Sequence, residues 1–353
     1  MNKWDYYSLK KVIELYNRRI RHREIIKYAG RNVLSSDGGN RLIGKMLNAD
    51  TPFAVSRFGS TELSVILRRE AHRHHRFYRD NDTNLCLLSG FFPNEKRMMD
   101  RFSDMMLSIV GEIDLIGLWF SSLEEYIVGE YMRSALLTHL TALEPYAYAE
   151  PWSRELKDKK VLVVHPFESS IKKQYARREK LFKNLTVLPQ FELKTFKAVQ
   201  TIAGEEDTRF ATWFDALEYM KNGIRQIDFD VAIIGCGAYG MPLAVEVKRM
   251  GKQAIHMGGA TQILFGIKGA YQGQSVSFPT QEDYGKGKMT TIHADFRQYP
   301  SYKESLTDYS KLIINGLAGN PTFYHGVLKA NTTNYQQATK FLTGRYATDT
   351  YYD

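Results

Sequence analysis

The sequence predicts an α/β fold, with a Rossmann-like, mostly parallel sheet flanked by helices. Short apolar runs rich in β-branched residues recur between residues 53 and 262, and most are followed by amphipathic stretches with helical spacing. Strands and helices that alternate in this way form a parallel sheet with helices on both faces. At least five strand ends carry Gly, Ser, His, Gln or charged residues. Because open α/β sheets bind ligands at the carboxyl ends of their strands, we expect a site there.

The composition limits the classes of protein to which this chain can belong. At 353 residues the chain can hold one large domain or two modest ones, and 48 basic residues exceed 39 acidic ones. The two cysteines, Cys86 and Cys236, lack the spacing of a metal site or a disulfide framework, so we expect a reducing cytoplasm. There is no signal-peptide core and no run of about 20 apolar residues, so any membrane contact should be peripheral. No aromatic-plus-basic repeat indicates nucleic-acid binding.

The N-terminal segment, residues 1–48, is predicted to be helical. An apolar stripe with helical spacing predicts an amphipathic helix over residues 5–28: Leu9, Val12, Ile13, Tyr16 and Ile20. Nine basic residues lie among the first 31. They suit contact with an anionic membrane surface, although a solvated helix face is the commoner explanation.

The first core strand, Phe53–Arg57, ends in a chemically rich turn. Arg57 can pair with a phosphate or carboxylate through two hydrogen bonds, and Gly59 lets a ligand approach the backbone. Ser60 is a plausible N-cap for the next helix. Glu62 can bind a divalent cation, or it can simply sit favourably in the first helical turn.

The middle of the chain supplies further strands and helices. We expect strands at 85–88, 115–120, 161–164 and 193–199, and helices at 93–110, 122–142, 171–182 and 210–227. His165 follows the strand at 161–164, where it can bind phosphate, transfer a proton or satisfy a carbonyl group.

Residues 229–262 are the most organised stretch of the sequence. They read as two strand–turn–helix units with glycines in both turns, Gly235-Cys236-Gly237-Ala238-Tyr239-Gly240 and Gly258-Gly259-Ala260-Thr261-Gln262. Unpaired amides at a helix start attract phosphate or carboxylate groups. The first turn fits the dinucleotide fingerprint G-x-G-x-x-G, but the second strand lacks the terminal carboxylate that grips a ribose. Three interpretations of this turn therefore remain: a turn that faces a phosphate, tight packing of a helix on a strand, and a dinucleotide site.

The sequence changes character after Gly269. Residues 270–290 are predicted to be a polar, glycine-rich loop, followed by helices near 301–316 and 333–344. We therefore expect three parts: an N-terminal helical segment (1–48), a main domain (49–269) and a helical or irregular C-terminal extension (270–353).

Several segments carry a family resemblance: LEPYAYAEPWS, KKVLVVHPFESSI, LKTFKAVQTIAGE, DVAIIGCGAYGMPLA and AIHMGGATQILFGIKG. Together with the strand end Arg57–Glu62, residues 50–268 resemble the bacterial glycosyltransferases of the GT-D fold. The resemblance implies a GT-D-like catalytic domain at 49–269, a UDP-sugar donor and a divalent cation, Mn²⁺ or Mg²⁺. The family's Asp-x-Glu metal motif reads Ser60-Thr61-Glu62 here, which leaves Glu62 as the metal ligand.

The resemblance implies a glycosyltransferase that moves a sugar from a nucleotide-sugar donor to a glycan or glycoprotein acceptor in surface polysaccharide assembly. The alternatives are a nicotinamide-dependent oxidoreductase that uses Gly235–Gly240, and a nucleotide-sugar-binding protein without catalysis. We expect catalytic roles for Glu62, His165, Glu168 and Glu205. We expect donor or cofactor binding at Arg57, Gly59, Ser60, Lys194, Gly235, Gly237, Ala238, Tyr239, Gly258, Gly259, Thr261 and Gln262.

Overall fold

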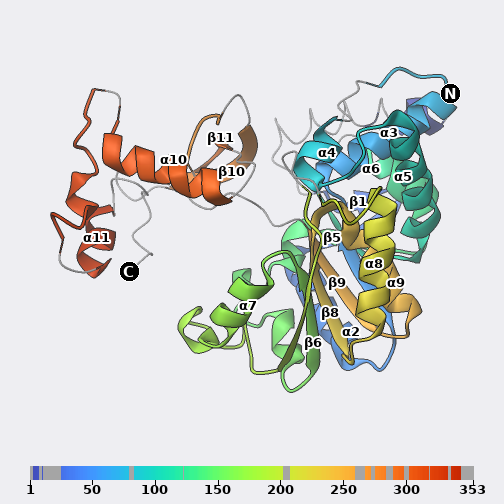
Figure 1. Cartoon of the computed structure of the whole chain (residues 1–353). Helices are drawn as coiled ribbons and strands as arrows, with labels where there is room; N and C mark the ends of the chain where they lie inside the picture. Colours follow the sequence, from blue (N-terminus) through green and yellow to red (C-terminus); the bar gives the residue numbers. More distant parts are fainter. Residues whose placement is uncertain are drawn as a thin grey trace. The chain divides into compact units, whose positions relative to one another are not determined.

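The structure, a computed structural model, describes most of the chain. Its described residues are 3–7, 10, 25–78, 83–121, 123–201, 207–258, 267–271, 275–283, 289–297, 302–317, 319–332 and 335–342. The chain forms two compact units, Met1–Ala260 and Thr261–Asp353 (Figure 1). Each unit is described by itself.

The first unit is built on a nine-stranded sheet in the described part of the chain. Its strands are β1 (Lys27–Tyr28), β2 (Arg31–Leu34), β3 (Phe53–Arg57), β4 (Leu115–Leu118), β5 (Leu136–His139), β6 (Lys160–His165), β7 (Glu192–Lys197), β8 (Val231–Gly235) and β9 (Gln253–Gly258). They lie in the order β1-β2-β5-β4-β3-β9-β8-β6-β7, and all neighbours are parallel except β1 and β2. The predicted mostly parallel α/β sheet is confirmed, and the carboxyl ends of its parallel strands share one edge.

Helices connect the strands and cover the sheet. The α-helices are α2 (Ser36–Asn48), α3 (Ser60–Arg73), α4 (Thr83–Ser89), α5 (Lys96–Ile109), α6 (Glu124–Tyr131), α7 (Glu168–Tyr175), α8 (Trp213–Arg225) and α9 (Gly240–Arg249). The 3-10 helices are η1 (Val110–Glu112), η2 (Leu140–Leu143), η3 (Pro145–Ala147), η4 (Trp152–Leu156), η5 (Arg178–Lys180) and η7 (Gly237–Tyr239).

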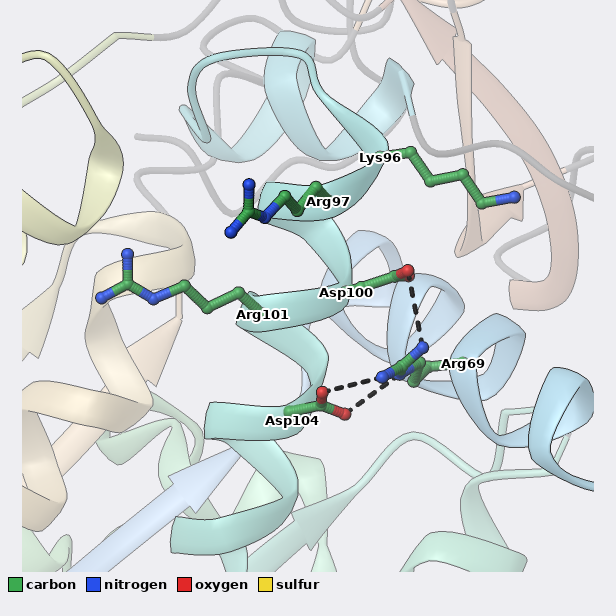
Figure 2. A pocket seen from close by; sticks show the side chains of 6 residues that line it. All are labelled: Arg69, Lys96, Arg97, Asp100, Arg101 and Asp104. Atoms are coloured by element: carbon green, nitrogen blue, oxygen red, sulfur yellow. Dashed lines mark hydrogen bonds and ion pairs between the residues drawn. The ribbon is translucent and has the colours of Figure 1, made fainter.

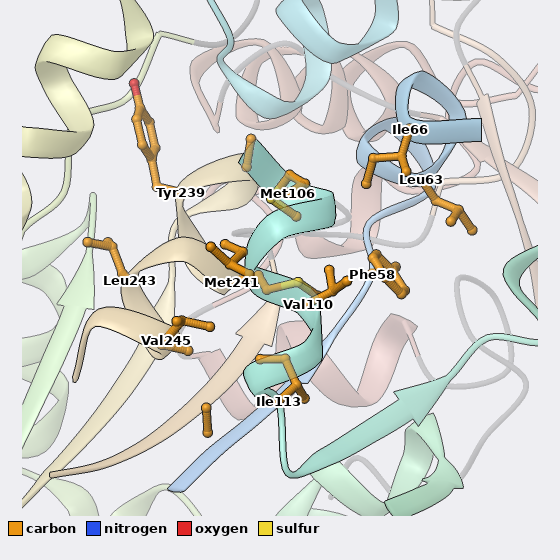
Figure 3. Packing of buried hydrophobic residues seen from close by; sticks show 14 of the residues in the cluster. Phe58, Leu63, Ile66, Met106, Val110, Ile113, Tyr239, Met241, Leu243 and Val245 are labelled. Atoms are coloured by element: carbon orange, nitrogen blue, oxygen red, sulfur yellow. The ribbon is translucent and has the colours of Figure 1, made fainter. Parts of the chain in front are cut away.

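The sheet buries side chains on both faces. Ala54 and Val55 are neighbours in β3, yet they belong to two different buried clusters. The larger cluster contains side chains from α3, α5, α8 and α9, and Figure 3 shows Met106 of α5 and Met241 of α9 within this cluster. The smaller cluster includes Leu47 of α2. Burial on both faces explains why these strands appear in the sequence as unbroken apolar runs.

Several predictions of helices and strands in this unit are wrong, and the helix predicted over 171–182 ends at Tyr175. The helix predicted over 122–142 ends at Tyr131, and β5 follows. The strand predicted at 85–88 lies in α4, because a short apolar run does not distinguish a strand from a buried helix. The helix predicted over 5–28 does not reach its expected end: residues 3–7 are helical, 27–28 form β1, and 11–24 lie outside the described residues.

The second unit combines a β-hairpin with two α-helices. Its elements are β10 (Ser275–Asp283), β11 (Met289–Arg297), α10 (Tyr302–Asn315), η8 (His325–Val327) and α11 (Tyr335–Leu342). The two strands pair antiparallel over their full length. Next to β11, Arg297 N donates to Ile267 O at 2.7 Å and Gly269 N donates to Asp295 O at 2.8 Å. An ion pair of 2.7 Å between Arg297 and Asp308 joins β11 to α10.

The helices predicted near 301–316 and 333–344 are confirmed by α10 and α11, whereas the loop predicted over 270–290 is wrong. Within it, β10 contains Val276 and Phe278 in alternation with serines, which is a strand pattern that Pro279 interrupts. The division at 48 and 269 stays a prediction. Among the described residues, none of the helices has both the length and the apolar character that a membrane span requires.

Candidate functional site

Four adjacent strands bring predicted site residues together at one edge of the sheet. In sheet order, β3, β9, β8 and β6 end at Arg57, Gly258, Gly235 and His165. A Cβ atom on Gly258 would come within 2.5 Å of Arg57 Nη1, and one on Gly235 within 3.0 Å of His165 Cδ2. Gly258 also has a φ of 114°, which residues with a side chain rarely adopt. These glycines let the guanidinium and the imidazole lie close to the backbone.

Arg57 is a partly buried cation with few protein partners. In the described part of the chain, its guanidinium makes one hydrogen bond, from Nε to Phe58 O at 3.2 Å. The guanidinium carbon also lies 4.7 Å from the centre of the Trp119 ring, which is a cation–π contact. Both Nη groups are therefore available to bind an anion.

Three carboxylates act on Arg57 from a longer range. Burial lowers the pKa of Arg57, whereas the negative charges of Glu62, Glu124 and Glu144 act in the opposite direction. No ion pair joins any of these carboxylates to the guanidinium among the described residues. The charges of these three carboxylates thus favour the charged form of Arg57.

Glu62 lies in the first turn of α3, where only 7% of its surface is exposed. Gly59 leaves room for it, because a Cβ atom there would overlap the carboxylate. Thr61 Oγ1 donates to Glu62 Oε2 at 2.8 Å and lies 2.6 Å from Ser89 Oγ, while Ser60 is exposed. Within the described ranges, no group of three or more His, Cys, Asp or Glu side chains could hold a metal ion. The metal role of Glu62 stays a prediction.

A buried Ser56–His256 pair lies beside the end of β3. His256 Nδ1 lies 2.9 Å from Ser56 Oγ, and both residues are buried. Burial, together with the nearby charge of Arg57, lowers the pKa of His256 to about 3. The imidazole is therefore neutral at physiological pH.

We predict that this histidine makes the first unit less stable in mild acid. The pKa of His256 is near 6.5 when the chain is unfolded and about 3 when it is folded, so the unfolded chain binds the proton between these values. The contribution of His256 to the free energy of unfolding has its full value above about pH 6.5. The free energy then falls by up to about 1.4 kcal/mol per pH unit as the pH decreases toward 3. Urea unfolding between about pH 5 and 7.5 measures this slope.

His256→Gln should reduce that slope. A smaller slope should remain, because burial also lowers the pKa of His165. Equal slopes in the two proteins would contradict the assignment to His256.

The η7 turn borders a small cavity of about 40 Å³, which is large enough for ordered water. Ser89, Thr201, Gly237 and Tyr239 are among the residues that line it. Tyr239 and Ala238 are buried, and the Tyr239 ring stacks on Trp213 with ring centres 4.8 Å apart. Burial raises the pKa of Tyr239, so its hydroxyl stays protonated.

Two other predicted site residues in the described part of the chain, Glu168 and Lys194, have partners of their own. Glu168 accepts hydrogen bonds from Lys172 Nζ at 2.7 Å and Thr195 Oγ1 at 2.5 Å, and these bonds lower its pKa. Lys194 forms an ion pair of 2.5 Å with Glu192 at the beginning of β7. Glu205, Gly259, Thr261 and Gln262 lie outside the described residues.

The sequence-based prediction missed Trp119 and Glu124. Trp119 directly follows β4 and is 39% exposed, although it is a large apolar side chain. Glu124 is fully buried and accepts hydrogen bonds from the backbone N–H groups of Trp119 at 3.3 Å and Ser121 at 2.9 Å. In the sequence, Trp119 could have been selected as a large aromatic residue at the end of an apolar strand.

A larger hollow, of about 570 Å³, lies open on the surface beside α5 (Figure 2). Arg69 bridges Asp100 and Asp104 there, with distances of 3.5 and 2.9 Å. Figure 2 shows that Arg97 and Arg101 point away from these ion pairs. The paired charges join α3 to α5, so we assign them a structural role.

The second unit has its own carboxylates. Glu282 and Asp283 occupy the last two positions of β10, where they pair with Thr290 and Met289 in the ladder. The other acidic positions of the described part are Asp295, Glu304 and Asp308. The ion pair with Arg297 engages Asp308.

Comparison with known proteins finds a family match that lies almost entirely in this second unit. Residues 256–353 match the Glucosaminidase family, described as mannosyl-glycoprotein endo-beta-N-acetylglucosaminidase. Over 89 residues, the chain is 52% identical to an N-acetylmuramoyl-L-alanine amidase domain-containing protein of Staphylococcus aureus. It is 48% identical over 89 residues to a probable N-acetylmuramidase of Lactococcus lactis subsp. cremoris. Each match covers 25% of this chain, and the chain spans 14% and 20% of these relatives.

A solved structure, described as the domain of unknown function 1792 with a distinct glycosyltransferase fold, aligns with 65% of this chain and 79% of that chain. The sequence identity is 15% and the TM-score is 0.38.

These findings correct the functional prediction. A GT-D glycosyltransferase with a nucleotide-sugar donor and a glycan or glycoprotein acceptor is wrong, because the family and the relatives matched by sequence carry the names of hydrolases. The oxidoreductase and non-catalytic alternatives are withdrawn with it. The resemblance covered residues 50–268 and left the extension after 270 unrecognised, whereas the family match spans residues 256–353. Over residues 256–353, this chain is similar to the glucosaminidase family.

Proposed function

We propose that the second unit hydrolyses the glycosidic bonds between β-linked, N-acetylated amino sugars of peptidoglycan. The observation that carries this proposal is the family match over residues 256–353, because it spans the whole of the unit Thr261–Asp353. The identities of about half over 89 residues support it, since one of those relatives is named for cleaving at N-acetylmuramic acid.

The chemistry of glycoside hydrolysis indicates which side chains of the second unit can be catalytic. Most glycosidases use Asp or Glu side chains, one of which protonates the leaving oxygen. In the described part of the second unit, Asp308 is already held by Arg297. The adjacent pair Glu282 and Asp283 lies at the end of β10, next to the connection to β11. We assign the general acid to one of these two residues.

The experiment is to incubate the full chain with purified peptidoglycan and to measure new reducing ends. We expect their number to rise with time and enzyme concentration, because each cleaved glycosidic bond exposes one reducing sugar. Asp228→Asn, an exposed carboxylate in the first unit that pairs with Lys160, is the control and should retain the activity. Release of peptides without new reducing ends would contradict the proposal.

A further inference from the structure

We infer that Arg57 and Trp119 form a binding site for the carboxylate of an acidic amino sugar. The inference rests on the proposed function, because peptidoglycan contains N-acetylmuramic acid, an amino sugar that carries a carboxylate. The first unit would then recognise a piece of the same polymer that the second unit hydrolyses.

The guanidinium provides the anion-binding half of this site. Among the described residues, its only hydrogen bond uses Nε, and the Nη groups have none. Gly258 lets the guanidinium lie close to the backbone of β9, because a Cβ atom there would come within 2.5 Å of Nη1. A guanidinium whose two Nη groups are free binds a carboxylate through two parallel hydrogen bonds.

Trp119 provides a surface for the sugar ring. Its indole is 39% exposed directly beside the guanidinium. Hydrogen bonds from the backbone N–H groups of Trp119 and Ser121 to the buried Glu124 fix the chain at this point. An exposed aromatic ring offers a large apolar contact with few rotatable bonds, and it suits the C–H face of a pyranose.

The surrounding charge favours a carboxylate over a phosphate. Glu62, Glu124 and Glu144 all act electrostatically on Arg57. One guanidinium can balance one negative charge, but a diphosphate brings at least two into a field that these carboxylates already make negative. A ligand with a single carboxylate therefore meets less repulsion.

Calorimetric titration of the full chain tests the site with three probes. N-acetylmuramic acid carries the carboxylate, N-acetylglucosamine has the same ring without it, and inorganic pyrophosphate carries phosphate alone. We expect N-acetylmuramic acid to bind at least about ten-fold more tightly than either other probe, as one charge-assisted pair contributes about 1.5–3 kcal/mol. Equal binding of the two sugars, or preferential binding of pyrophosphate, would overturn the inference.

Variants separate this site from other basic residues. Arg57→Gln should weaken binding of N-acetylmuramic acid about ten-fold or more, and Trp119→Ala should weaken binding of both sugars. Arg101→Gln is the matched control, because Arg101 also lies over an aromatic ring, that of Phe214 at 4.0 Å, and should leave binding unchanged. If Arg57→Gln lowers the melting temperature, the exposed Trp119→Ala variant carries the test. Unchanged binding in a folded variant at either position would overturn the inference.

The hydrolysis assay distinguishes failure of this inference from failure of the proposed function. If the full chain releases reducing ends but does not bind N-acetylmuramic acid at Arg57, the inference alone fails. If it binds N-acetylmuramic acid at Arg57 but releases no reducing ends, the hydrolytic function fails and the site stands.

Discussion

Glu282→Gln and Asp283→Asn should differ sharply in their effects: one variant loses about a thousand-fold in the rate of peptidoglycan hydrolysis and the other keeps most of it. The two residues are adjacent in β10. A single general acid protonates the leaving oxygen, so the two variants should not lose activity equally. The initial rate of reducing-end release measures the effect.

Asp308→Asn is the control for this experiment. It breaks the ion pair with Arg297, so we expect a lower melting temperature for the second unit without a comparable loss in hydrolysis at low temperature. If both Glu282→Gln and Asp283→Asn retain full activity, the general acid is not in this pair.

Gly240→Ala should destabilise the first unit by about 1–3 kcal/mol or more. Gly240 begins α9, and a Cβ atom there would overlap the buried imidazole of His256. Both the helix and the ring belong to a closely packed interior, so the added methyl group displaces one of them. Denaturant unfolding measures the loss, and hydrogen exchange in β8 and β9 should locate it there.

Gly44→Ala is the matched control for this change. Gly44 lies inside α2, where an added Cβ would make ordinary contacts, 3.6 Å from Glu155 Cγ and 3.8 Å from Trp152 Cα. Because alanine is about 1 kcal/mol better than glycine in a helix interior, this variant should be more stable than the parent. Equal unfolding free energies for the two variants would contradict the packing described around His256.

The sheet was largely predictable from the sequence, because strands buried on both faces appear as unbroken apolar runs. Val161–Val164 and Val231–Ile234 are such runs and form β6 and β8. β5 was missed because it has four residues and its first, Leu136, is 51% exposed. It is neither a continuous run nor a clean alternation. β10 was missed for another reason, since Pro279 interrupts its strand pattern.

The candidate site was predictable where a polar residue ends a strand. Arg57, His165, Gly235 and Gly258 converge because parallel strands place their carboxyl ends at one edge. Trp119 occupies an equivalent position but is apolar, so the same rule did not select it. The function was not predictable from these residues, because the informative similarity lies in residues 256–353.

The most direct measurement is the identity of the new reducing ends that the full chain produces from peptidoglycan. Reduction with borohydride followed by mass spectrometry labels the terminal sugar of each fragment. We expect reduced N-acetylglucosamine termini, which appear with the parent chain and disappear with the inactive variant at Glu282 or Asp283. Fragments without any reduced amino-sugar terminus would contradict glycan hydrolysis by the second unit.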